Sequence, residues 1–92
     1  MPEEGVAAIQ LEQPLRGEVV SYYVEAASAV AGSRISELPI PDGSAVMLVV
    51  RGRELVAARG RTTLRPGDHV YVFTTPPEKP FVQLLFGREE EG

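Results

Sequence analysis

The sequence predicts a small single α+β domain with the element order β-α-β-β-β-α and a mostly antiparallel sheet. Two strand signals are clear: the alternating stretch "HVYVFT" and the continuous apolar run Val46–Val50. The apolar stretch "PFVQLLFG" near the C-terminus indicates a closing helix. A chain of 92 residues has room for one domain of this kind and one modest core.

The first predicted strand is "EVVSYYV", which is rich in β-branched and aromatic residues. Strict alternation places Val20, Tyr22 and Val24 on one face. Val19 and Tyr23 then point to the opposite face. A strand with this pattern is expected at residues 18–24.

A short helix is predicted after this strand. Residues 28–38 carry apolar side chains at helical spacing, but Gly32 in the middle favours a turn followed by a short helix. Pro39 and Pro41 end that helix and make "LPIPDG" a rigid connector to the next strand.

The middle of the chain predicts a hairpin. The run Val46–Val50 is typical of a strand buried on both faces. Gly52 stands at the first central position of a two-residue turn, which suits type II′. Residues 55–58 return as the partner strand, and residues 69–74 follow as the last strand after a second turn-rich stretch.

The closing helix is expected within residues 75–87. Thr75 and Glu78 have the spacing of a capping box, although Pro80 also allows the helix to begin only there. Gly87 is a natural stop. Its apolar face is predicted from the spacing of Phe81, Leu84 and Leu85.

Composition restricts the function classes. Thirteen acidic residues against nine basic ones give a net charge of -4, which disfavours binding to a nucleic acid polymer. The absence of cysteine excludes disulfides and thiolate metal sites. No apolar run reaches the roughly 18 residues of a membrane span, and the start does not resemble a signal peptide, so the sequence predicts a cytoplasmic protein. We divide the chain into a lead-in segment (1–16), a globular domain (17–87) and a solvated acidic tail (88–92).

Asp68 and His69 are the strongest candidates for catalytic residues, but their positions do not allow them to act together. Adjacent residues entering a strand point to opposite faces, so the two side chains cannot act as a pair. The chain has no second histidine and no cysteine to complete a metal site or a thiol dyad. In the structural interpretation Asp68 accepts backbone N–H bonds in a turn. Arg51, beside the apolar strand, is interpreted as a surface residue. We therefore predict no enzyme activity, no metal and no cofactor.

An ordered series of residues resembles the TrkA-C domain, the C-terminal domain of the RCK regulators of potassium transport. The positions that match this family pattern are Val24, Ser28, Gly32, Ile35, Glu37, Leu38, Arg51, Gly52, Gly60, Thr62 or Thr63, Leu64, Gly67 and Asp68. Arg59 departs from it, because the family often has proline there. No G-x-G-x-x-G is present, so nucleotide binding of the Rossmann type is not expected.

The resemblance implies a cytosolic regulatory, ligand-sensing and dimerising domain of a potassium or other cation transport system. The connector and closing helix resemble the version attached to bacterial potassium/proton antiporters. It implies a homodimer, a membrane transporter subunit or domain as partner, and a small regulatory ligand such as a cyclic dinucleotide, of which cyclic di-AMP is one. The alternative function is a ligand-free protein–protein interaction module of the same small α+β fold.

The ligand contacts that the resemblance implies lie in the connector and at the start of the next strand. They are Leu38, Pro39, Ile40, Pro41, Asp42, Ser44 and Val46. The competing interpretation is that the apolar members of this set only pack in the core or an interface. From the residues themselves we also predict a symmetric dimer, because a strand that is apolar on both faces has thin cover in so small a chain.

Overall fold

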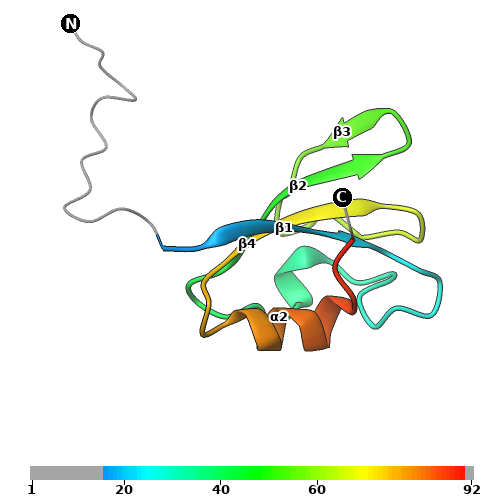
Figure 1. Ribbon diagram of the computed structural model, residues 1–92. Helices are drawn as coiled ribbons and strands as arrows, with labels where there is room; N and C mark the ends of the chain where they lie inside the picture. The colour runs from blue at the N-terminus through cyan, green and yellow to red at the C-terminus, as the bar shows by residue number, and fades with distance from the viewer. Residues whose placement is uncertain (1–15, 91–92) are drawn as a thin grey trace, which may run out of the picture.

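The computed structural model describes residues 16–90 and contains a four-stranded sheet, one α-helix and one 3-10 helix (Figure 1). The elements are β1 (Glu18–Tyr23), η1 (Ile35–Glu37), β2 (Ala45–Arg51), β3 (Glu54–Val56), β4 (His69–Thr74) and α2 (Lys79–Phe86). The sheet order is β1-β4-β2-β3, and every neighbouring pair is antiparallel. The predicted fold class and element order are confirmed. The lead-in segment lies outside the described residues except for residue 16.

The neighbouring strands β1 and β4 contribute four of the ten buried hydrophobic residues among those described. In β4 the side chains alternate as predicted, with Val70, Val72 and Thr74 fully buried. Val20 and Tyr22 of β1 lie on the same face, because Val20 pairs with Val72 and Tyr22 with Val70. The inner face of the sheet packs on η1 and α2, which Figure 1 shows together on one side of β1 and β4.

The β2–β3 hairpin forms with the predicted turn. Gly52 has a φ of +63°, and no non-glycine residue among those described has a positive φ, so the turn is type II′. An extra residue, Met47, interrupts the pairing of β2 with β4 between Val46 and Leu48.

The prediction that Val46–Val50 is buried on both faces is wrong for the single chain. Only Val49 in this run is fully buried, and Met47 is 56% exposed. The physical reason is that η1 and α2 both cover the same side of the sheet.

The short helix is reduced to one 3-10 turn. The chain from residue 26 to residue 32 makes consecutive turns, and Gly32 adopts a φ of +85° as the predicted break. The Glu37 carboxylate accepts a 2.9 Å hydrogen bond from the backbone N–H of Arg34 and so closes the start of η1.

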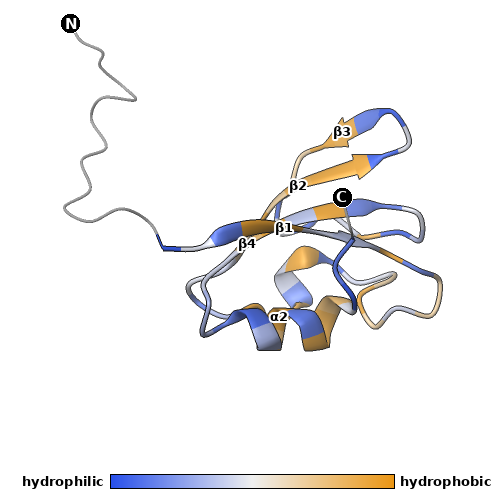
Figure 2. Ribbon diagram, viewed as in Figure 1, coloured by the Kyte–Doolittle hydropathy of each residue, from blue (hydrophilic) through white to orange (hydrophobic). Residues whose placement is uncertain are grey.

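The closing helix begins at Lys79, and two expectations about it are wrong. Glu78, not Thr75, is the N-cap residue, and its side chain bonds to the connector instead of closing a capping box. Val82 and Phe86 form the buried face, and Leu85 is half-buried against the core as predicted, but Phe81 is 61% and Leu84 82% exposed. Five of the eight helix residues are apolar, and Figure 2 shows orange interrupted by blue along α2. At 3.6 residues per turn these five residues span about 200° of the helix circumference, so spacing alone does not select the buried face. On the buried face, the ring of Phe86 stacks on Tyr22, with ring centroids 5.1 Å apart.

The expectation of a solvated tail is also wrong for its described part. Glu89 forms an isolated antiparallel β-bridge with Tyr22, and the backbone N–H of Glu90 donates to the carbonyl of Ser21 at 2.7 Å. Lys79 holds the same segment through an ion pair of 3.2 Å with Glu89. Residues 16–90 include no helix long and apolar enough to cross a membrane.

Candidate functional site

The connector between η1 and β2 carries the predicted ligand contacts, and its backbone is tightly turned. The N–H of Ile40 donates to the carbonyl of Leu38 at 2.8 Å, and the N–H of Ser44 donates to the carbonyl of Pro41 at 2.9 Å. With Pro39 and Pro41 fixing two φ angles, little conformational freedom is left to the segment. A ligand would therefore meet a preformed surface.

Glu78 ties the connector to the start of α2. Its carboxylate accepts hydrogen bonds from the Gly43 N–H at 3.1 Å and from the Ser44 hydroxyl at 2.7 Å. The Ser44 oxygen also lies 2.9 Å from Oγ1 of Thr74. A hydroxyl donates only one hydrogen bond, so Thr74 is the donor in that contact. A Cβ at Gly43 would come within 2.9 Å of the carboxylate, so glycine permits this close approach.

The seven predicted contacts fall into three groups in the structure. Leu38 and Val46 pack against the core, and the hydroxyl of Ser44 is already used by Glu78. Pro39 and Asp42 are exposed. The remaining two, Ile40 and Pro41, are half-buried.

A groove of about 590 Å³ lies elsewhere, between the chain after β1 and the end of α2. Its walls are formed by residues 27–29 on one side and residues 84–90 on the other, with Tyr23 and Glu25. No predicted connector contact lines it.

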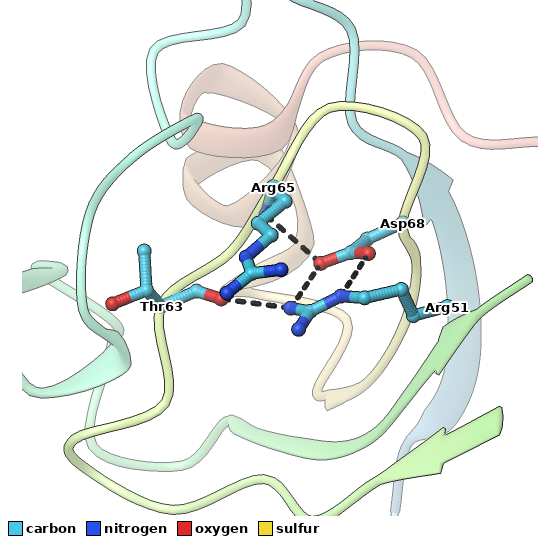
Figure 3. A network of polar contacts seen from close by, with 4 residues as sticks. All are labelled: Arg51, Thr63, Arg65 and Asp68. Carbon is cyan, nitrogen blue, oxygen red and sulfur yellow. Dashed lines mark hydrogen bonds and ion pairs between the residues drawn. The ribbon is translucent and has the colours of Figure 1, made fainter.

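Arg51 and Asp68 form a bidentate ion pair at the end of β2 (Figure 3). Nε and Nη2 of Arg51 each donate to one carboxylate oxygen of Asp68 at 2.9 Å, and Nη2 also donates to the carbonyl of Thr63 at 2.9 Å. The N–H of Arg65 donates to the same carboxylate at 2.9 Å. The prediction that Asp68 accepts a backbone N–H in its turn is confirmed, whereas the interpretation of Arg51 as a mere surface residue is wrong.

These contacts determine the charge state of the pair. Burial raises the pKa of Asp68, but the hydrogen bonds from Arg51 and from the backbone of Arg65 outweigh burial and leave the pKa below its ordinary value. The hydrogen bond to Asp68 in turn raises the pKa of Arg51. Asp68 is therefore a permanently ionised structural group in the ordinary pH range.

His69 takes part in a different cluster. Its Nδ1 lies 3.0 Å from both carboxylate oxygens of Glu90. The Glu90 carboxylate also accepts a hydrogen bond of 2.6 Å from the hydroxyl of Ser21. Burial raises the pKa of Glu90, and the bonds from Ser21 and His69 outweigh it, so the pKa lies below its ordinary value. Asp68 and His69 thus have separate partners, as predicted from their opposite directions.

Sequence reasoning missed the partners of Arg51, Glu78 and Glu90. The pairing of strands could have revealed the partner of Arg51: Val50 pairs with His69 in the sheet, so the next residue, Arg51, lies beside Asp68. That signal requires knowing that β2 pairs with β4, which is not its neighbour along the chain.

The comparisons with known proteins agree on one family. The model of the TrkA-C domain matches residues 19–78. A Methanosarcina mazei protein, "Trk system potassium uptake protein TrkA homolog 2", is 26% identical over 83 residues, which is 90% of this chain and 18% of that protein. "Trk system potassium uptake protein TrkA" from Vibrio alginolyticus is 36% identical over 56 residues, covering 61% of this chain and 12% of that protein. The chain thus spans less than a fifth of the length of these curated relatives.

Two solved structures share the fold. "Structure of RCK domain with cda" has a TM-score of 0.56 at 21% identity and covers 77% of this chain and 99% of its own. "S. agalactiae BusR in complex with its busAB-promotor DNA" has a TM-score of 0.60 at 17% identity and covers 88% of this chain and 40% of its own.

Proposed function

The chain belongs to the TrkA-C domain family, and we propose that it is a cytoplasmic regulatory domain of a potassium transport system, of the potassium/proton antiporter type. The observation that carries the proposal is the family match over residues 19–78, joined to a four-stranded antiparallel sheet with the fold of an RCK domain. We further propose that the domain dimerises and senses a small ligand.

The ligand in this proposal is a cyclic dinucleotide bound at the connector. Pro39, Ile40 and Pro41 offer an apolar, preformed surface on which a base can pack. The exposed carboxylate of Asp42 is an acceptor for an exocyclic amino group. Two carboxylates, Asp42 and Glu78, border this surface, so recognition runs through the bases and not through the phosphates.

The role is regulatory and not catalytic. Asp68 is engaged by Arg51, and His69 by Glu90, so neither side chain is free to serve the other as acid and base. The DNA in the BusR structure belongs to that protein, and a net charge of -4 disfavours direct contact of this domain with DNA.

A second candidate function is a ligand-free protein–protein interaction module. One observation favours it: large apolar side chains are exposed on two sides of the domain, including Leu55 at 73% and Leu84 at 82%. In that case partners dock and no small molecule binds the connector.

Potassium flux tests the proposed function. The transport system of the source cell is assayed in membrane vesicles with the full regulatory protein and with residues 17–87 of this domain deleted. We expect the flux to lose its response to cyclic di-AMP when the domain is deleted, while basal transport persists. Identical flux and identical response with and without the domain would contradict the proposal. A potassium flux that changes when the domain is deleted but does not respond to cyclic di-AMP would favour the protein–protein interaction module.

A further inference from the structure

Helix α2 exposes two large apolar side chains that the core does not use. Phe81 is 61% exposed and Leu84 82%. They lie three positions apart, so they are neighbours on the helix surface. Leu84 also lines the groove of about 590 Å³ between the chain after β1 and the end of α2. We call this joined surface the α2 groove: Tyr23, Glu25, residues 27–29, Phe81 and residues 84–90.

Hydrogen bonds hold both walls of the α2 groove in place. On one wall, Gly87 ends the helix with a φ of +95°, and its N–H donates to the carbonyl of Gln83 at 2.7 Å. The N–H of Glu90 then donates to the carbonyl of Ser21 at 2.7 Å and fixes the chain beyond the helix on β1. On the other wall, consecutive turns in residues 25–31 are closed by backbone hydrogen bonds of 2.9 and 3.1 Å. The surface is therefore preformed, which lowers the entropic cost of binding.

The shape of the α2 groove suits a protein segment better than a small molecule. A small-molecule site encloses most of the surface of its ligand. Phe81 and Leu84 instead project from the helix and are mostly exposed, so they would leave much of a small molecule in water. Apolar side chains beside a groove are the arrangement that receives an amphipathic helix, whose apolar positions repeat every three or four residues.

The charges of the α2 groove favour a cationic partner. Glu25, Glu89 and Glu90 line it, and Arg88 is the only basic residue among the lining residues that the structure describes. Lys79 balances Glu89 through their ion pair of 3.2 Å. Glu25 is exposed, and none of the ion pairs within residues 16–90 includes it. The groove thus offers a carboxylate to a cation that another molecule brings.

We propose that the α2 groove binds a cationic amphipathic segment of the transporter that this domain regulates. This inference rests on the proposed function and adds the surface through which the domain contacts its membrane partner. Cytoplasmic segments of membrane proteins carry an excess of lysine and arginine close to the bilayer, which complements the acidic groove. Anionic lipid headgroups have the opposite effect, because they repel the same carboxylates.

Each part of the groove has a role in this contact. Phe81 and Leu84 pack against the apolar side of the bound segment and supply most of the affinity. Glu25 pairs with a lysine or arginine of that segment, and Tyr23, 44% exposed, offers an aromatic face to a second cation. Exposed ion pairs contribute little energy, so the charges mainly select the partner and its orientation.

Photocrosslinking in the membrane vesicles of the flux assay tests the surface. The photoreactive amino acid p-benzoylphenylalanine replaces Leu84 in the full transport system, and mass spectrometry identifies the crosslinked peptide. Leu55 is the matched control position, because it is 73% exposed and lies in the β2–β3 hairpin away from α2 (Figure 1). We expect position 84, and not position 55, to crosslink to a cytoplasmic segment of the transporter that is rich in lysine or arginine. Crosslinks from position 84 to lipid alone, to a second copy of the domain alone, or to nothing overturn the proposal.

Charge reversal tests the role of Glu25. We expect Glu25→Lys to lower the crosslinking yield at position 84 by at least about tenfold and to abolish the response of the flux to cyclic di-AMP. Ala29→Lys, at a second exposed position of the groove, provides the same test if Glu25→Lys does not fold. Glu54→Lys reverses an exposed charge on β3 and should leave both quantities unchanged.

The outcomes separate this proposal from the proposed function. If deletion of the domain alters the flux response while Glu25→Lys and Ala29→Lys behave as the parent, the groove is overturned and the regulatory function stands. If deletion leaves the flux and its response unchanged while position 84 still crosslinks to the transporter, the regulatory function is overturned and the docking surface stands.

Discussion

Arg51 and Asp68 are joined by two parallel hydrogen bonds of 2.9 Å, and the carboxylate of Asp68 is fully buried. The pair ties the end of β2 to the turn that leads into β4. Because Arg51 also reaches the carbonyl of Thr63, one guanidinium fixes two segments that are distant in the chain. The planar fork of arginine suits this geometry, which an ammonium group does not reproduce.

Removing the cation should destabilise the domain strongly. Arg51→Met leaves a buried carboxylate with only the backbone N–H of Arg65, so we expect a loss of about 2–3 kcal/mol in the free energy of unfolding. Arg51→Lys should recover only part of it. Urea denaturation measures both.

The matched control for that loss is Arg53→Met, on the exposed turn next to Arg51. It should change stability by less than about 0.5 kcal/mol. The double variant Arg51→Met/Asp68→Leu should be more stable than Arg51→Met alone, because no unpaired charge is then buried. Equal effects of Arg51→Met and Arg53→Met would show that the pair does not stabilise the fold.

The same pair predicts a pH dependence. The pKa of Asp68 is lowered in the folded state, so the ionised carboxylate contributes stability that is fully present above its unfolded pKa of about 3.9 and is lost as pH falls further. Glu90, whose pKa is also lowered, adds a loss of the same sign. The melting-temperature gap between the parent and Asp68→Asn should therefore be constant from pH 7 to 5 and narrow below about pH 4.

A control separates this effect from general acid denaturation. Glu25 is exposed, and Glu25→Gln should follow the parent at every pH. A gap between the parent and Asp68→Asn that stays constant down to pH 2 would contradict the assignment.

Glu78 should control the order of the connector. Glu78→Ala removes the acceptor of the Gly43 N–H and the Ser44 hydroxyl, so we expect faster hydrogen exchange at the Gly43 amide and a loss of about 1–2 kcal/mol in stability. NMR-detected exchange measures the first quantity. Glu54→Ala, an exposed acid in β3, should leave the Gly43 amide unchanged. Unchanged exchange in Glu78→Ala would mean that the prolines alone hold the connector.

The strands were predictable from the sequence because their patterns are local. In β1 and β4 apolar residues alternate with a period of two, and the structure buries the predicted face of each. The buried face of α2 was predictable only in part, since the apolar residues Phe81, Val82, Leu84, Leu85 and Phe86 span about 200° of the helix circumference. On the buried face Phe86 stacks on Tyr22, which lies 64 positions away in the sequence. A local pattern does not reveal such a contact.

The polar contacts of the site show the same division. The turn at Asp68 was predictable from Pro66 and Gly67, because local dihedral preferences produce it. The bond of Glu78 to Gly43 joins residues 35 positions apart, and no local pattern encodes it. Whether the connector binds a ligand stays a prediction from the family resemblance.

Ligand binding is expected to depend on the connector. Cyclic di-AMP should raise the melting temperature of the parent chain, because a ligand that binds the folded state stabilises it. Asp42→Ala should reduce that shift by more than half, while Glu54→Ala should keep it. AMP serves as the control nucleotide. A shift that is the same in Asp42→Ala and in the parent would place the ligand elsewhere.

Thiol accessibility tests the proposed dimerisation most directly. The chain has no cysteine, so Val19→Cys and Leu84→Cys each carry a single reactive group. The first lies on β1, on the side of the sheet opposite η1 and α2, and the second lies on α2. The labelling rate of each variant is measured with a maleimide reagent at protein concentrations below and above the dissociation constant. We predict that Val19→Cys reacts more slowly at the higher concentration and that Leu84→Cys reacts at the same rate at both. Slower reaction of Leu84→Cys with no change at Val19→Cys would contradict the account.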